Sequence, residues 1–201
     1  MDDVTKVLKE NINKYPFVEA FLKIDKLLLR KDIVNVAIDG MSASFKTSFS
    51  KVLMEIYHCN VFHMDDFFLN EEMKTQERLS EIGGNIHYER FKDEVLNHLG
   101  EEFKFLKYDC KTGDFIESEL IKKNKLNVIE GVYSLHPYFG DIYDLSIFFK
   151  VDDDIQKQRL LMRNEKLYEK FINQWIPMEN RYFKENNLMG KSDLVIDTSN
   201  L

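Results

Sequence analysis

The alternation of short apolar runs with longer segments of helical periodicity is the feature that most constrains the fold of this chain. The runs are rich in β-branched and aromatic residues, which favours buried strands. They span residues 33–38, 60–64, 125–131, 144–151 and 193–197. Strands that are apolar on both faces and separated by helices are typical of a parallel sheet covered on two sides. The sequence therefore predicts an α/β fold with about five parallel strands flanked by helices.

Helices and one hairpin complete the predicted order of elements. The predicted helices cover residues 2–12, 15–30, 46–58, 88–99, 154–170 and 171–186. Strands over 103–109 and 115–120 are joined by the turn-forming sequence TGD, which indicates a β-hairpin. A polar stretch over 71–85 contains the flexible pair Gly83-Gly84.

Length and charge exclude several classes of protein. A chain of 201 residues, 44% hydrophobic and 31% charged, has the balance of a globular protein and is long enough for one well-buried domain over 1–201. Its formal net charge of −7 argues against nucleic-acid binding, because a surface that follows phosphates needs a basic excess. A small phosphorylated ligand stays compatible, since it requires only a few local cations.

Membrane and disulfide classes are also disfavoured. No apolar run reaches the roughly 20 residues needed to cross a bilayer, and the acidic, amphipathic N-terminus is unlike a secretory signal. We therefore expect a cytoplasmic protein without a membrane partner. Cys59 and Cys110 lack C-x-x-C spacing, so reduced thiols are expected rather than a disulfide framework or a zinc site. The sequence leaves open whether the protein forms a homo-oligomer.

The stretch DGMSASFKT, from Asp39 to Thr47, differs at one position from the phosphate-binding pattern G-x-x-x-x-G-K-[ST]. It joins a predicted strand to a predicted helix, so backbone N–H groups and the positive end of the helix dipole would face an anion. In such a loop Lys46 reaches the outer phosphates and the hydroxyl of Thr47 ligates Mg²⁺. The candidate loop residues are Gly40, Met41, Ser42, Ala43, Ser44, Phe45, Lys46, Thr47 and Ser48. A surface turn with a solvated lysine is the alternative.

Acidic residues follow two further predicted strands directly. Asp65 and Asp66 come after the run that ends at residue 64, and Glu130 ends the run over 125–131. Ligands of parallel sheets bind beyond the carboxyl ends of the strands, so these acids are expected near the loop. They have the chemistry of a base for a hydroxyl nucleophile and of metal holders. Because adjacent residues of an extended segment point to opposite sides, we expect only one of the aspartates to enter the site.

Other candidate residues carry less information on their own. Arg159 and Arg163 are four residues apart on one predicted helix face and suit a clamp on a phosphoryl group. Surface arginines paired with nearby acids are the alternative. His58 and His63 show no metal-ligand spacing and are interpreted as packing or strand-end residues.

Taken in order, several blocks resemble those of uridine kinase/phosphoribulokinase-type P-loop kinases, particularly small bacterial uridine kinase-like proteins. The blocks are VAIDGMSASFKTSFSKVL, VFHMDDFFL, GGNIHYERF, FLKYDC, VIEGVYSLHP and QRLLMRN, within about residues 30–197. The resemblance implies a P-loop NTPase-type sheet, an acceptor-binding insertion with a small β element at about 71–120 and an arginine-bearing helical lid at about 154–170. It also implies transfer of the γ-phosphoryl group of ATP, with Mg²⁺, to a hydroxyl, typically the 5′-OH of a ribonucleoside such as uridine.

The resemblance assigns roles position by position. Asp65 matches the general base, while Lys46 and Thr47 match the phosphate and Mg²⁺ residues. Glu130 matches a glutamate near the metal, which Asp65 also helps to hold. Arg159 and Arg163 align with lid arginines. The residues that match the acceptor region are Asp65, His87, Tyr88, Arg90, Tyr108 and Asp109.

The family pattern G-x-[SC]-[GA]-S-G-K-[ST] has small flexible residues at the two positions that hold Ala43 and Phe45 here, and Phe45 departs from it. Glycine at the second of these positions lets the backbone approach phosphates without a Cβ. If the backbone there needs a positive φ, a bulky residue costs about 1–3 kcal/mol, or about 5- to 150-fold in affinity. Three functions stay open: an active nucleoside kinase, an impaired homologue that binds a nucleotide or a partner, or a kinase for pantothenate, a vitamin riboside or a sugar.

Overall fold

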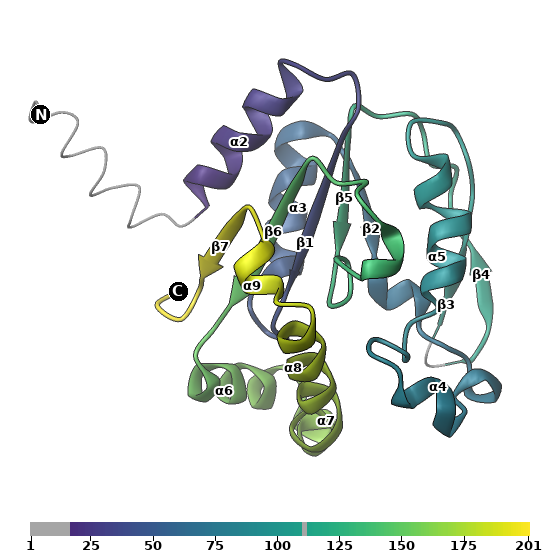
Figure 1. Ribbon diagram of the computed structural model, residues 1–201, viewed down its shortest axis with the longest axis vertical. Helices are drawn as coiled ribbons and strands as arrows, with labels where there is room; N and C mark the ends of the chain where they lie inside the picture. Colours follow the sequence, from purple (N-terminus) through teal and green to yellow (C-terminus); the bar gives the residue numbers. More distant parts are fainter. Residues whose placement is uncertain (1–16, 110–111) are drawn as a thin grey trace, which may run out of the picture.

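The computed structural model describes residues 17–109 and 112–201 (Figure 1). Its main feature is a five-stranded parallel sheet in the order β2-β5-β1-β6-β7. The strands are β1 (Val34–Gly40), β2 (Asn60–His63), β5 (Leu126–Glu130), β6 (Leu145–Lys150) and β7 (Leu194–Asp197). The predicted α/β fold is confirmed, and β1 is its central strand.

Helices cover both faces of this sheet, and strand residues alternate between the two cores. Ile147 and Phe149 of β6 lie in the core beneath two helices, whereas Phe148 between them lies in the other core. The first core packs against α2 (Val18–Leu28) and α3 (Lys46–Tyr57). The second packs against α5 (Tyr88–Glu94), α8 (Ile176–Glu185) and α9 (Leu188–Lys191). This period of two explains why the strands are apolar throughout.

The predicted helix over 154–170 consists of two helices, α6 (Asp153–Arg163) and α7 (Glu165–Lys170). Asn164 between them has an extended backbone, and its side chain accepts a hydrogen bond from the N–H of Leu167 at the start of α7. A short amide side chain competes with helical hydrogen bonds in this way, which explains the break. The segment predicted as a helix over 171–186 begins with a π-helical turn, η5 (Phe171–Trp175), and continues as α8.

The region between β2 and β5 is more broken than the sequence predicts. The helix predicted over 88–99 ends at Glu94 and is followed by a 3₁₀ turn, η3 (Leu96–His98). The predicted hairpin is confirmed, but its antiparallel strands are short. They are β3 (Leu106–Tyr108) and β4 (Phe115–Glu117). The polar stretch contains η2 (Glu71–Met73) and α4 (Gln76–Ser80).

Two further predictions differ from or lie outside this description. Residue 64, predicted as the end of a strand, begins the 3₁₀ turn η1 (Met64–Phe67). A second 3₁₀ turn, η4 (Pro137–Phe139), follows β5. The predicted helix over 2–12 and Cys110 lie outside the described residues, while Cys59 is a buried free thiol. No helix in the described part of the chain is long and apolar enough to cross a membrane.

Candidate active site

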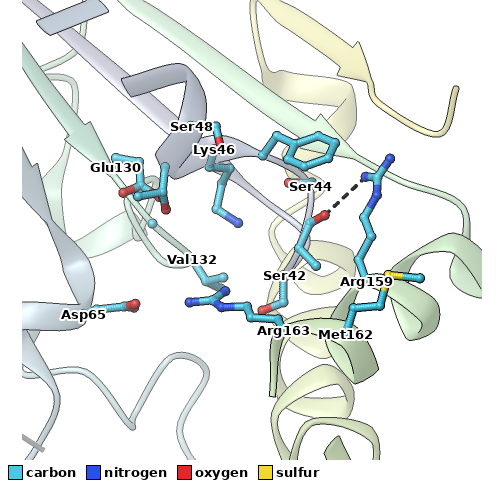
Figure 2. Close-up of a pocket in the computed structure, with 14 residues that line it drawn as sticks. Ser42, Ser44, Lys46, Ser48, Asp65, Glu130, Val132, Arg159, Met162 and Arg163 are labelled. Carbon is cyan, nitrogen blue, oxygen red and sulfur yellow. Dashed lines mark hydrogen bonds between the residues drawn. The ribbon is translucent and has the colours of Figure 1, made fainter. Parts of the chain in front are cut away.

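A cavity of about 490 Å³ lies at the carboxyl end of the sheet, beside α6. Its walls come from the loop after β1, the turn after β2, the end of β5 and the helix after β6 (Figure 2). The lining residues are 42–48, Asp65, 130–132, Arg159, Met162 and Arg163. Lys46, Asp65 and Glu130 therefore share one cavity, although they lie far apart in the sequence.

The loop between β1 and α3 has the backbone of a phosphate-binding loop without its second glycine. At Gly40 a Cβ would lie 2.0 Å from the carbonyl oxygen of Phe149, so only glycine fits there. Ala43 and Phe45 both have left-handed backbones, with φ of 60° and 68°. Each costs about 1–3 kcal/mol in a residue other than glycine and persists only where neighbouring contacts fix it.

The ring of Phe45 forms part of the cavity wall and does not fill the cavity. It is 38% exposed, and its centroid lies 4.2 Å from the guanidinium carbon of Arg159. This geometry is a cation–π contact. Lys46 and the acids Asp65 and Glu130 also line the cavity beside the loop.

Lys46 is buried and is the cation that several acids share. Its ammonium donates to the carbonyl oxygens of Gly40 and Met41, both at 2.8 Å. A lysine ammonium has three donors, so one hydrogen stays available for a ligand. Burial raises the pKa of four surrounding carboxyl groups, and the positive charge of Lys46 opposes this rise; the groups are Asp39, Asp65, Glu130 and Glu179.

Thr47, Glu130 and His63 form a hydrogen-bonded chain at the back of the cavity. The Thr47 hydroxyl donates to one Glu130 oxygen at 3.0 Å, and the His63 Nδ1 lies 2.7 Å from the other. Burial pushes the pKa of Glu130 upward, but His63, Lys46 and Thr47 together hold that pKa below its ordinary value. The bond to Glu130 in turn raises the pKa of His63. Glu130 is thus a carboxylate, the form that can hold a hard cation.

The two neighbouring aspartates point to different surroundings. Asp65 lies open to the cavity, whereas the carboxylate of Asp66 lies 3.5 Å from the ammonium of Lys107. Enclosure by protein raises the pKa of Asp65, and the negative charge of Glu130 raises it further. A carboxylate with increased proton affinity is better suited to accept a proton from a hydroxyl.

The two arginines of α6 have different environments. Arg159 donates to the carbonyl oxygens of Ala43, Thr198 and Leu201 at 3.2, 2.6 and 3.1 Å. Arg163 makes no hydrogen bond or ion pair within residues 17–109 and 112–201, and in Figure 2 its guanidinium extends toward Asp65. Arg163 therefore has free donors for an anion in the cavity. Arg159 also lines the cavity, and both its terminal nitrogens donate to the loop or to the end of the chain, so its predicted phosphoryl contact stays a prediction.

Of the predicted acceptor residues, Asp65 lines this cavity, whereas the others are not among its lining residues. His87 caps α5 by accepting from the N–H of Arg90, whose side chain donates to the carbonyl of Leu106. Tyr108 is buried against Phe115 of the hairpin.

Tyr88 is bound by Arg78, a residue that was not among the candidates predicted from the sequence. Arg78 donates to the Tyr88 hydroxyl at 2.6 Å and lies over its ring. It also donates to both carboxylate oxygens of Glu89. The role of these side chains toward an acceptor stays a prediction.

Two buried acids hold the loop and were missed at the level of sequence. Glu179 of α8 accepts from the N–H of Ser42 at 3.2 Å and from its hydroxyl at 2.6 Å. Asp39 accepts from the N–H groups of Gly40 and Leu135 and from the Tyr182 hydroxyl, at 2.6, 2.9 and 2.8 Å. A charged residue at the end of an apolar strand was a visible signal for Asp39, but nothing marked Glu179 within an amphipathic helix.

Asp39 makes folding stability depend on pH. Burial raises its pKa from 3.8 to about 6, so between these values the folded state binds a proton that the unfolded state does not. Its contribution to stability is complete below pH 3.8 and is lost as the pH rises through about 6. We expect the unfolding free energy of wild type minus that of Asp39→Asn to increase by roughly 1 kcal/mol between pH 7.5 and pH 5. Urea unfolding of both proteins measures it, and an unchanged difference would contradict the burial argument.

The cavity contains residue types that suit a phosphate and a magnesium ion. The hydroxyl of Ser44 is buried in the loop and has no hydrogen-bond partner in the described residues. Within the same residues, no group of three or more His, Cys, Asp or Glu side chains could form a metal site. Mg²⁺ usually takes one or two carboxylates and completes its shell with phosphate oxygens and water. Thr47, Glu130 and Asp65 provide such a partial set of ligands.

The described residues thus form an α/β fold, with a five-stranded parallel sheet flanked by helices, a small antiparallel hairpin and a strand–loop–helix unit at the centre of the sheet. A solved structure described as a possible uridine kinase from Bacillus stearothermophilus is similar, with a TM-score of 0.66 and 19% sequence identity over 90% of this chain and 100% of that one. A crystal structure of an uncharacterized protein from Eubacterium ventriosum matches with a TM-score of 0.44 and 16% identity over 84% and 89% of the two chains. No family model and no curated protein sequence matches the chain.

Proposed function

We propose that the protein is a phosphotransferase that moves the γ-phosphoryl group of ATP, in the presence of Mg²⁺, to a hydroxyl of a small molecule. The observation that carries this proposal is the single cavity shared by Lys46, Asp65 and Glu130 beside a phosphate-type loop. The 5′-OH of uridine or a related nucleoside is the first acceptor to test, because the similar structure is described as a possible uridine kinase.

The residues of the cavity divide the work of phosphoryl transfer, which consists mostly of positioning and electrostatics. The loop N–H groups and the third donor of Lys46 bind the phosphates. Arg163 contacts the transferring group with its free guanidinium, and Asp65 accepts the proton of the acceptor hydroxyl. Thr47, Glu130 and Asp65 would hold Mg²⁺, which supplies neutralisation of negative charge on the phosphates.

A second candidate follows from the backbone at Phe45. The φ of 68° at a bulky residue favours a catalytically impaired homologue that still binds a nucleotide or a partner. Pantothenate, a vitamin riboside or a sugar are alternative acceptors for an active enzyme. Among the residues predicted to face the acceptor, only Asp65 lines the cavity, so the acceptor screen includes all these classes of hydroxyl compound.

Calorimetric titration with Mg·ATP separates the two candidates. We expect wild type to bind Mg·ATP and, in an ATP-consumption screen of nucleosides, vitamins and sugars, to turn over at least one acceptor. Binding without turnover of any acceptor would favour the impaired homologue. Absence of binding heat in wild type, with heat regained by Phe45→Gly, would show that the ring blocks the loop and would contradict the kinase proposal.

A further inference from the structure

The loop after β1 is held in its left-handed conformation by side chains from outside the loop. Ala43 and Phe45 have φ of 60° and 68°, and neither is a glycine that would adopt this backbone readily. Strained residues persist only where the surrounding structure determines their conformation. The contacts made to these two residues therefore identify what stabilises the loop.

Arg159 of α6 contacts both strained residues at once. Its Nη1 donates to the carbonyl oxygen of Ala43 at 3.2 Å, and its guanidinium lies 4.2 Å from the ring centroid of Phe45. The guanidinium is itself fixed, because it donates to the carbonyl oxygen and hydroxyl of Thr198 at 2.6 and 3.3 Å. A planar group can bond in its plane and stack on its face simultaneously, which a lysine ammonium cannot do.

Neighbouring contacts hold the residue before Ala43 in the same way. Gln156, one helical turn before Arg159, donates to the carbonyl oxygen of Ser42 at 2.9 Å. Glu179 of α8 accepts from the N–H and the hydroxyl of Ser42. Side chains of α6 and α8 therefore hold the loop from outside, while Lys46 lies on the side of the loop that faces the cavity.

We propose that Arg159 is a positioning residue that keeps the loop in its phosphate-binding conformation where the usual pattern relies on glycine. The inference rests on the proposed function for its ligand, ATP, but its structural part concerns the loop alone. It replaces the predicted role of Arg159 as a contact to the transferring phosphoryl group. It also gives Phe45 a function, since the guanidinium of Arg159 packs on the Phe45 ring and so contacts the loop.

A double-mutant cycle tests the proposal. Arg159→Lys, which keeps the charge and loses the planar contacts, is compared in the wild-type loop and in a loop carrying Ala43→Gly and Phe45→Gly. In the wild-type loop we expect Arg159→Lys to weaken Mg·ATP binding about tenfold and to lower Tm. In the two-glycine loop, where the backbone adopts a positive φ without help, its effect on affinity should be less than about twofold, with a similarly reduced effect on Tm.

Kinetics distinguish positioning from direct contact with the reacting group. Arg159→Lys should raise KM for ATP and leave kcat within about twofold, the sign of lost ground-state binding. The matched control Arg163→Lys, four residues along the same helix, should lower kcat to the same extent in both loops. A fall in kcat at unchanged KM for Arg159→Lys would overturn the proposal.

Equal losses of affinity and Tm in the two loops would also overturn it, because the role of Arg159 would then be independent of the strained residues. The Tm measurements need no nucleotide. If wild type binds no Mg·ATP, the proposed function fails, but the four Tm values still decide whether Arg159 holds the loop.

Discussion

Asp65→Asn is expected to lower turnover by about 10²- to 10⁴-fold, the usual contribution of a general base. Binding of Mg·ATP should change by less than about threefold, since the phosphates are bound mainly by the loop and Lys46 and the asparagine keeps an oxygen that can contact Mg²⁺. The reason is chemical: an asparagine keeps the size and hydrogen-bonding reach of Asp65 but accepts no proton. The environment favours this role, because enclosure and the charge of Glu130 both raise the pKa of Asp65.

The neighbouring residue provides a matched control for this prediction. Asp66 lies one position along the same turn, but its carboxylate faces Lys107 on the hairpin. Asp66→Asn should therefore keep turnover within about threefold, consistent with loss of one partly exposed ion pair. Release of ADP in the presence of an accepted substrate measures turnover, and calorimetry measures binding. Near-normal turnover of Asp65→Asn, or equal losses in both variants, would remove Asp65 from the role of base.

The sheet could be predicted because its residues obey a simple local rule. Strands buried on both faces are apolar throughout, and helical spacing between them excludes direct hairpins. Element boundaries were less accessible, since they depend on single side chains. Asn164 divides a predicted helix by capping its second half, and the strand predicted to end at residue 64 turns into η1 one residue early.

The site was predictable only where topology alone brings residues together. Parallel strands place their carboxyl ends on one edge, so Lys46, Asp65 and Glu130 meet whatever the side-chain packing. Contacts that depend on packing could not be foreseen. Glu179 bonds Ser42, a residue 137 positions away, and no local pattern encodes that pair.

Contacts that depend on packing also explain why some residues have partners that the sequence did not predict. His63 has no metal-ligand spacing, but β2 pairs with β5 in the register that sets it beside Glu130. Tyr88 has the type expected of an acceptor residue, yet Arg78 and His136 engage it. The Phe45 ring lies against Arg159, which belongs to a helix more than a hundred residues further along the chain.

Lys46→Met is expected to have the second large effect, on ligand binding and on stability together. Loss of the ammonium should weaken Mg·ATP binding by at least about a hundredfold, because a close charge–phosphate contact is removed. It also leaves four carboxyl groups without the cation that opposes the rise in their pKa values caused by burial. Buried charges that lose their partner typically cost about 3–5 kcal/mol.

The pH dependence of this destabilisation follows from its electrostatic origin. Without Lys46 the folded-state pKa values of these acids rise, so protonation of the folded state begins at a higher pH than in wild type. The stability that the variant gains from protonation is present at low pH and is lost as the pH rises through the raised values. The deficit relative to wild type should therefore be largest at about pH 8 and smaller at about pH 5.

Lys51→Met is the matched control, since Lys51 lies on the same helix with its side chain exposed. Its unfolding free energy should stay within about 0.5 kcal/mol of wild type at both pH values. Urea unfolding of the three proteins at each pH makes the comparison. A deficit for Lys46→Met that is the same at both pH values would show that packing of the lysine stem, and not its charge, supports the acids. Unchanged affinity for Mg·ATP would place the phosphates away from Lys46 and contradict the binding mode proposed for the loop.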